Sequence, residues 1–501
     1  MFWRGGGQTP AMKRGTLCTL GLVLGLLGRG SALADSDWVS LFDGRTLAGW
    51  RAAEHPATFR VEDGCVVAHG PRAHLFYTGA VELADFRNFE FEAEVKAAPG
   101  ANSGIYFHTA FQETGWPARG LEVQIHNATR HQGDYVELKK TGSLYGLRNI
   151  YKPLVADDTW FTLYIAVRGS RVQVRLNNRL LVDYVEPAPA AGPSDRPGRR
   201  LGHGTFALQG HDPDSRVAFR NVRVKPLPAS LPDETKPVAA DDTWWQMVEL
   251  GMANFPLVDF HTHLKGGLTL EELLAHSRRT GMNHGVAVNC GLGFAVTNDA
   301  AALAFLAELA NAPVFAGMQA EGREWVRLFT PQTVARFDYV FTDAMTLTDW
   351  RGRRTRLWIS EEVDIPDKQA FMEHLVNTIV GILEREPIDI YANPTYLPDV
   401  LAPEYDALWT PERQQRVIAA AARHGVAIEI NSRLQLPKPA FIRQARQAGV
   451  KFTLGTNNAG REILPNTYGL RMVRECGLTW RDMWMPKPDG QKPIQRRNAG
   501  S

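Results

Sequence analysis

The stretch PLVDFHTHLKGG, from Pro256 to Gly267, marks the point at which the pattern of predicted strands and helices changes. Asp259, His261 and His263 alternate along a short apolar run, as side chains do along a β-strand. Downstream of this stretch, short apolar runs alternate with amphipathic helical segments, which predicts β-α units and a parallel sheet. Upstream, short alternating strands follow one another with almost no helical segment. The stretch therefore separates an all-β half from an α/β half.

The α/β half contains seven candidate strands, and each is followed by polar or helical sequence. They are LVDFHTHL (257–264), HGVAVNC (284–290), VFAGMQAEG (314–322), DYVFTDAM (338–345), IDIYANP (388–394), VAIEINS (426–432) and KFTLGTNN (451–458). Seven strands predict a distorted (β/α)7 TIM-like barrel over residues 255–486 rather than a regular eight-stranded one. Residues 487–501 are expected to form a flexible tail.

The all-β half shows the period-two alternation of half-buried strands, as in FEFEAEVKA at residues 89–97. The segment RVQVRLNNRLLVDY predicts a hairpin that turns at Asn177 and Asn178. Many short strands with Gly and Asn turns predict a jelly-roll or concanavalin-like β-sandwich over residues 35–228. A Pro-rich and charged segment then predicts a linker over residues 229–254.

The composition and the N-terminal segment limit which class of protein this chain can belong to. The 501 residues carry a formal net charge of +2, with 44% hydrophobic and 22% charged residues, which is typical of a soluble globular protein. No charge excess indicates a nucleic-acid partner. Basic residues, the apolar run 16–28 and then Ala32 and Ala34 predict a signal peptide over residues 1–34. The run is shorter than the roughly 18 residues that span a bilayer, so we expect a secreted or periplasmic protein without a membrane anchor after cleavage.

Cysteines are few in the predicted mature chain. Cys65, Cys290 and Cys476 are widely spaced, odd in number and in no Cys-x-x-Cys pattern. Isolated buried thiols are expected rather than a disulfide framework.

Polar residues end the barrel strands, where such barrels place their active sites. The α/β half resembles the polymerase-and-histidinol-phosphatase family of metal-dependent phosphoesterase barrels. The motifs that carry the resemblance are DFHTH, QAEG, FTDA, ANPTYLP, IEINS and LGTNNA, over residues 255–486. The resemblance implies metal ligands at His261, His263, Glu321, Asp343 and Glu429.

The same half departs from the family pattern in three places. Asn393 stands where a His is usual, Asn457 where an Asp is usual, and Ala459 where a His is usual. Because amides are weak ligands and alanine is none, a multi-metal centre is not expected, and one divalent metal is the most that the donors support. The alternatives are a metal-free site that binds a polyol through Asn393, Asn431 and Asn457, and a structural remnant.

The all-β half resembles the 3-keto-disaccharide hydrolase domain family, a concanavalin-like sandwich of secreted bacterial proteins. The motifs are SLFDGRTLAGW, ANSGIYFH, GLEVQIHN, TGSLYG and FRNVRVKPL, within residues 38–227. Alternation places Glu122 with Gln124 and His126 on one face of its strand, and Tyr106 with His108 on one face of another. Such a polar, aromatic face holds sugar rings, although an ordinary solvent-facing side of a sheet is the alternative.

These observations lead to a set of expected site residues. Glu122 is the candidate general base or acid, with His108 or His126 as its partner. The candidate substrate-binding residues of the sandwich are Asn102, Ser103, Tyr106, Gln124 and Tyr145.

The expected function is cleavage of 3-keto-glycosides or disaccharides in the sandwich, as a hydrolase or lyase acting on a small carbohydrate. The ketone acidifies the neighbouring C–H, so a base and a cation or proton donor near the ketone oxygen suffice for elimination, after which water adds. A metal would also serve as that cation. The barrel is expected to be accessory. The alternative is a non-catalytic glycan-binding sandwich attached to a metal-dependent barrel hydrolase or isomerase.

Overall fold

The computed structural model describes residues 37–132, 134–189, 196–231 and 239–498. By its internal contacts, the described chain from Val39 onward forms one compact unit. The predicted signal peptide lies outside the described residues. Among the helices that are described, none is long and apolar enough to cross a bilayer.

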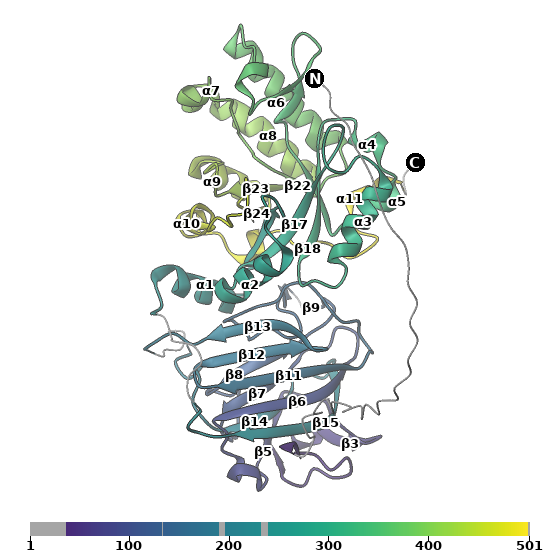
Figure 1. The fold of residues 1–501 in the computed structure, drawn as a ribbon, viewed down its shortest axis with the longest axis vertical. Coiled ribbons are helices and arrows are strands. Elements are labelled where there is room, and N and C mark those ends of the chain that lie inside the picture. The colour runs from purple at the N-terminus through teal and green to yellow at the C-terminus, as the bar shows by residue number, and fades with distance from the viewer. Residues whose placement is uncertain (1–36, 133, 190–195, 232–238, 499–501) are drawn as a thin grey trace, which may run out of the picture. The chain divides into compact units, whose positions relative to one another are not determined.

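Two antiparallel sheets form the first part of the fold (Figure 1), which confirms the predicted sandwich. The larger sheet has the order β13-β12-β11-β6-β15-β4-β3, with β1 on β15. Its strands are β1 (Val39–Ser40), β3 (Phe59–Glu62), β4 (Cys65–His69), β6 (Asn88–Ala97), β11 (Phe161–Arg168), β12 (Arg171–Leu176), β13 (Arg179–Val185) and β15 (Arg216–Leu227).

The smaller sheet has the order β2-β5-β14-β7-β8. Its strands are β2 (Trp50–Ala52), β5 (Ala73–Tyr77), β7 (Ser103–Thr109), β8 (Leu121–Ile125) and β14 (Thr205–Gly210). A short hairpin joins β9 (His131–Gln132) to β10 (Tyr135–Val136).

Alternation along β6 shows why the larger sheet forms. Phe89, Phe91 and Val95 are fully buried between the sheets, while the glutamates between them face out and pair with arginines of β11 and β15. The hairpin turn at Asn177 and Asn178 has φ values of 48° and 65°, as a two-residue turn with both central residues left-handed requires. The predicted hairpin is confirmed.

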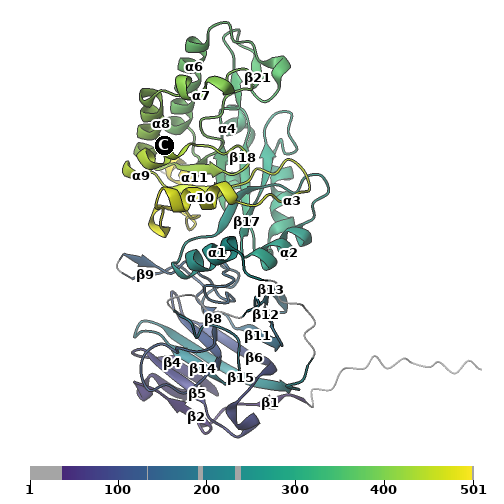
Figure 2. The same ribbon diagram turned by 90° about the vertical axis from the view of Figure 1, so that its left-hand side faces the viewer.

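Seven parallel strands close the barrel in the order β16-β17-β18-β19-β22-β23-β24, which confirms the predicted seven-stranded barrel. They are β16 (Val258–Thr262), β17 (Asn283–Cys290), β18 (Phe315–Ala320), β19 (Tyr339–Thr342), β22 (Ile390–Tyr391), β23 (Ala427–Asn431) and β24 (Phe452–Gly455). The helices around them (Figure 2) are α2 (Leu270–Thr280), α3 (Asp299–Leu309), α4 (Trp325–Leu328), α5 (Pro331–Val334), α6 (Lys368–Arg385), α7 (Tyr405–Leu408), α8 (Pro411–His424), α9 (Pro439–Gln447) and α10 (Thr467–Glu475). A hairpin of β20 (Thr346–Thr348) and β21 (Arg354–Arg356) is inserted after β19.

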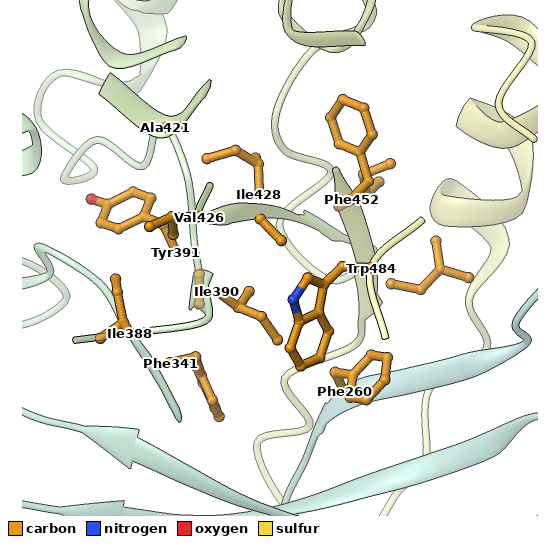
Figure 3. Packing of buried hydrophobic residues seen from close by; sticks show 14 of the residues in the cluster. Phe260, Phe341, Ile388, Ile390, Tyr391, Ala421, Val426, Ile428, Phe452 and Trp484 are labelled. Atoms are coloured by element: carbon orange, nitrogen blue, oxygen red, sulfur yellow. The ribbon is translucent and has the colours of Figure 1, made fainter. Parts of the chain in front are cut away.

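Large side chains fill the barrel interior. Tyr339 is buried and its hydroxyl donates to Phe260 O at 2.6 Å. A Cβ at Gly285 of β17 or Gly317 of β18 would lie 2.4 Å from an atom of this tyrosine ring or hydroxyl, so both strands need glycine there. Figure 3 shows Trp484 beside Phe260, and their ring centroids are 5.4 Å apart. The barrel is therefore a packed core rather than a channel.

Two segments differ from the sequence predictions. The expected linker contains helix α1 (Asp242–Met252), which Asp241 caps by accepting from Trp244 N. The expected flexible tail contains helix α11 (Pro493–Asn498). Both helices lie next to Pro-rich or charged sequence, and that composition led to the expectation of a linker and a tail. Cys65, Cys290 and Cys476 are free and buried, as expected.

Replacing Phe206 tests the sandwich core. This ring is fully buried, with centroids 4.7–4.9 Å from Phe86, Phe89 and Phe91. We expect Phe206→Ala to lower the free energy of unfolding by about 3–5 kcal/mol, because it leaves a cavity. Leu83→Ala is the control, since Leu83 is 89% exposed and should change stability by less than about 0.5 kcal/mol. Equal effects in denaturant unfolding would contradict this packing.

Candidate functional site

A cavity of about 190 Å³ opens in the sandwich. Its lining comes from the outward-facing residues of β7, β8 and β14 and from nearby loops. The lining residues are Asn102, Tyr106, Trp116, Glu122, Gln124, Tyr135, Glu137, Tyr145, Arg196, Arg199, Gln209 and His211. Because pockets for drug-sized ligands measure about 300–1,000 Å³, this cavity suits a small polar ligand of about one ring.

A buried ion pair forms the floor of the cavity. Arg199 Nη2 donates to Glu122 Oε2 at 3.1 Å, and both side chains are only 5% exposed. Gln209 Nε2 donates to Glu122 Oε1 at 3.0 Å, so both oxygens of Glu122 are engaged. Burial opposes the charge of Arg199, but Tyr106 and Glu122 outweigh it and raise the pKa of Arg199 above its ordinary value. The guanidinium is therefore charged at any ordinary pH.

Two polar atoms on this floor lack partners. Arg199 Nη1 and Gln209 Oε1 are buried, and neither has a hydrogen-bond partner within the described part of the chain. Buried polar atoms are almost always paired, so an unpaired donor and acceptor that line one cavity are features of a ligand site. Burial raises the pKa of Tyr106 and of Tyr145, which keeps both phenols protonated near neutral pH.

A second ion pair forms one wall. Lys139 Nζ lies 3.0 Å from Glu137 Oε1 and 4.4 Å from the centroid of the Tyr145 ring. Tyr135 and Tyr145 donate their hydroxyls to Glu137 Oε2 at 2.9 and 3.3 Å. Burial alone would raise the pKa of Glu137, but Lys139 holds it below its ordinary value. This carboxylate is therefore charged and fully engaged.

An imidazole and an indole also line the cavity. His211 Nδ1 lies 2.7 Å from Asp212 Oδ2, and the His211 and Trp116 rings are 5.2 Å apart. Asn102 Nδ2 lies 3.2 Å from His211 Nε2. Trp116 is 41% exposed, so it offers an aromatic face beside the cavity.

The structure brings together five residues predicted for the sandwich site. Glu122, Asn102, Tyr106, Gln124 and Tyr145 all line the cavity. Gly104 makes room for them, because a Cβ there would lie 2.6 Å from Glu122 Oε1.

Three predicted residues of the sandwich lie elsewhere. His108 has φ +54°, which breaks the alternation of β7, and its ring contacts Arg87 O at 2.9 Å and Gly202 N at 3.1 Å. His126 follows the end of β8 and its ring contacts Ala101 O at 3.1 Å. Ser103 donates to Gln209 O at 2.7 Å. None of these side chains lines the cavity.

Sequence reasoning missed several lining residues. Gln209 and His211 lie on and just after β14, in the segment TFALQGHD, whose polar end resembles the polar strand ends noted in the barrel. Arg199 lies in a loop, far along the chain from Glu122, and no periodicity signals it.

The barrel mouth holds a connected polar network. His261 Nδ1 lies 2.6 Å from Glu429 Oε1, while Glu429 Oε2 accepts from Asn393 N at 2.7 Å and Asn431 Nδ2 at 3.1 Å. Asn393 Oδ1 accepts from Asn431 at 3.0 Å and from Asn457 at 3.3 Å. The three asparagines predicted to bind a polyol therefore bond to one another or to Glu429.

The other predicted metal ligands also have partners. Asp343 accepts from Asn393 Nδ2 at 2.6 Å and from Met345 N at 2.9 Å, and Glu321 accepts from Asn289 Nδ2 at 2.8 Å. Burial, reinforced by Asp343, raises the pKa of Glu321 to about 7.

The side chains at the barrel mouth meet only part of what a metal centre needs. His261 and His263 have their Nδ1 atoms beside Glu429 and Ala287 O, as metal-bound imidazoles usually do. Their Nε2 atoms are buried without partners among the described residues. Nevertheless, in the same described ranges, no three His, Cys, Asp or Glu side chains come together as a metal site. The residues fit two ligands of a single ion and do not fit the multi-metal centre that the family resemblance implies.

The sandwich is similar to a known domain family. Residues 37–225 match the family model described as 3-keto-alpha-glucoside-1,2-lyase-like domain. The resemblance predicted for this half is confirmed.

Individual relatives are more distant. A 3-keto-disaccharide hydrolase from Bacteroides thetaiotaomicron is 35% identical over 81 residues, which is 15% of this chain and 28% of that protein. A solved structure from Parabacteroides distasonis, provisionally described as a glycosyl hydrolase, is 21% identical with a TM-score of 0.33 and covers 38% of this chain and 95% of its own. A histidinol phosphate phosphatase from Lactococcus lactis, solved with zinc, L-histidinol and phosphate, is 13% identical with a TM-score of 0.36 and covers 48% of this chain and 98% of its own.

Truncating the buried ion pair tests the geometry of the cavity floor. Glu122→Ala leaves the Arg199 charge buried without its partner, and we expect a loss of about 3–5 kcal/mol in the free energy of unfolding. The matched control is Glu113→Ala, because Glu113 pairs with Arg51 at 3.9 Å on the exposed surface. That change should cost no more than about 1 kcal/mol. Similar losses in both variants, measured by denaturant unfolding, would show that Glu122 and Arg199 are not buried together.

Proposed function

We propose that the sandwich cleaves 3-keto-glycosides by elimination, in a protein exported from the cytoplasm. The observation that carries the proposal is the buried, unpaired Nη1 donor of Arg199 in a cavity of about one ring. The family match of residues 37–225 supplies the substrate class. A fixed cation at the cavity floor is what a developing oxyanion on a sugar ketone requires.

The reaction follows from the acidity beside a ketone. Removal of the C2 proton places negative charge on the oxygen at C3, where Arg199 Nη1 would donate a hydrogen bond. When the C3 ketone re-forms, a C1–C2 double bond forms and the C1–O bond to the leaving group breaks. Water then adds to the unsaturated sugar and gives the free 3-keto sugar. Gln209 Oε1, the unpaired acceptor, would bind a ring hydroxyl.

Glu122 takes a role different from the predicted general base. Its two oxygens already accept from Arg199 and Gln209. A carboxylate held in this way is a poor proton acceptor but a good anchor for a guanidinium, because the charged bonds fix its orientation. We therefore assign Glu122 as the residue that positions Arg199.

A non-catalytic glycan-binding sandwich is the competing function. Trp116 and the polar lining would also hold a sugar without cleaving it. The Arg199 donor favours catalysis, because simple sugar binding does not need a buried cation with an unused hydrogen.

Loss of the Arg199 cation tests the proposal directly. The full chain should release the leaving alcohol from 3-keto-glucosides and not from the parent glucosides, as followed by chromatography. Arg199→Gln should lower kcat by about 10²–10³-fold, the usual cost of losing one oxyanion donor.

The control for this variant is Arg51→Gln, since Arg51 lies outside the cavity and its side chain is 59% exposed. It should retain full activity. Thermal melting would confirm that both variants are folded at the assay temperature. No product from the wild-type chain on any 3-keto-glycoside would contradict the proposal and favour the glycan-binding alternative.

For the barrel, we propose a single divalent ion held by the Nε2 atoms of His261 and His263. The two buried, unpaired nitrogens favour it, and water or a bound ligand would complete the shell. Such an ion would polarise an oxygen of a molecule bound at the barrel mouth.

Metal analysis tests the barrel proposal. The wild-type chain, equilibrated with Zn²⁺ and freed of unbound ion, should contain close to one ion, and His263→Ala should contain almost none. His374→Ala is the control, because His374 lies in α6 and contacts Thr348 O at 2.7 Å. Equal metal content in all three proteins, measured by mass spectrometry, would remove the proposed site.

A further inference from the structure

The elimination needs a base, and few of the side chains that line the cavity can act as one. Glu122 and Glu137 each accept hydrogen bonds on both oxygens and face a cation, Arg199 or Lys139. The tyrosines are protonated phenols, because burial raises their pKa. Among the lining residues, His211 alone is an imidazole. A neutral imidazole is the side chain most often used to move a proton at neutral pH.

The hydrogen bonds around His211 fix its tautomer. Asp212 only accepts, so the Nδ1 atom at 2.7 Å carries the hydrogen. Gln124 Nε2 donates to Asn102 Oδ1 at 3.1 Å, so Asn102 presents its Nδ2 hydrogen to His211 Nε2 at 3.2 Å. His211 Nε2 is therefore the unprotonated nitrogen, and its one lone pair accepts from Asn102 here, so a bound substrate must displace this neutral amide before Nε2 can take a proton. It belongs to a side chain that lines the cavity.

Asp212 is held in place by other groups. Arg130 Nη2 and Ser215 Oγ each donate to Asp212 Oδ2 at 2.9 Å, and Asp214 N donates to Oδ1 at 2.9 Å. Burial alone would raise the pKa of Asp212, but the bonds from His211, Arg130 and Ser215 lower it to about 2. A fixed carboxylate behind an imidazole orients the ring and stabilises the imidazolium that forms when it accepts a proton.

We propose that His211 is the catalytic base of the sandwich and that Asp212 positions it, an assignment that rests on the proposed 3-keto-glycoside elimination. Nε2 takes the proton from C2, and the C–H electron pair forms the enolate whose oxygen Arg199 binds. The enolate then collapses, the C1–O bond breaks, and the departing oxygen takes the proton back from His211. Every proton and electron pair is accounted for, and no oxidant or further reactant is needed.

Hydrogen exchange at C2 isolates the step assigned to His211. The full chain is incubated in D₂O with a 3-keto-glucoside, and deuterium at C2 and alcohol release are both followed. His211→Ala should slow both by at least about 100-fold, within the range for general base catalysis, with KM changed by only a few-fold. Added imidazole should restore part of the C2 exchange, and Asp212→Asn should slow exchange less than His211→Ala does.

The chain contains a matched control pair outside the cavity. His203 Nδ1 lies 2.6 Å from Asp85 Oδ1, and both side chains are about half exposed. His203→Ala removes the same kind of pair from the same domain, and it should leave exchange and cleavage unchanged.

The outcomes separate this assignment from the proposed function. An inactive wild-type chain would overturn both. An active wild-type chain whose His211→Ala variant keeps C2 exchange would overturn the assignment of the base and leave the elimination standing. Loss of exchange in His211→Ala with rescue by imidazole supports the base, because a purely structural role would not respond to imidazole.

Discussion

The buried pair of Glu122 and Arg199 is the constraint on which the sandwich site depends. An arginine at 5% exposure must be neutralised, and Glu122 of β8 does this. The pair then fixes what surrounds it. Gly104 must lack a side chain, because a Cβ would meet Glu122, and Gln209 turns its amide nitrogen toward the same carboxylate. Two atoms of this group remain unpaired, and they mark the place for a ligand. They are Arg199 Nη1 and Gln209 Oε1.

The barrel also buries charged side chains that need partners, and it supplies those partners in another way. Its buried carboxylates are satisfied by amides and backbone groups: Glu429 accepts from Asn393 and Asn431, and Asp343 accepts from Asn393. Each amide supplies both donors and an acceptor, so asparagines at these positions link the carboxylates into one network. The Nε2 atoms of His261 and His263 are the imidazole nitrogens that this network leaves unpaired among the described residues.

The fold was largely predictable from the sequence because its signals are local. The alternation of Phe89, Phe91 and Val95, the Asn177–Asn178 turn and the seven apolar runs of the barrel each depend on neighbours in the chain. Helices α1 and α11 were not predicted, because the Pro-rich and charged sequence around them indicated a linker and a tail. In the site, Tyr106, Glu122 and Gln124 were predicted because strand alternation places them on one face. His108 was placed wrongly on that face, since its left-handed backbone interrupts the alternation.

The sequence by itself determined the two architectures and the strand face that carries the sandwich cavity. Only the tertiary structure decided which charges meet. Arg199 and His211 come from segments that β-sheet pairing and loop packing bring to Glu122 and Asn102, across dozens of residues of chain. Periodicity records which side of a strand a residue faces. It does not record which distant residue lies opposite, because that depends on sheet order and loop paths rather than on local backbone geometry.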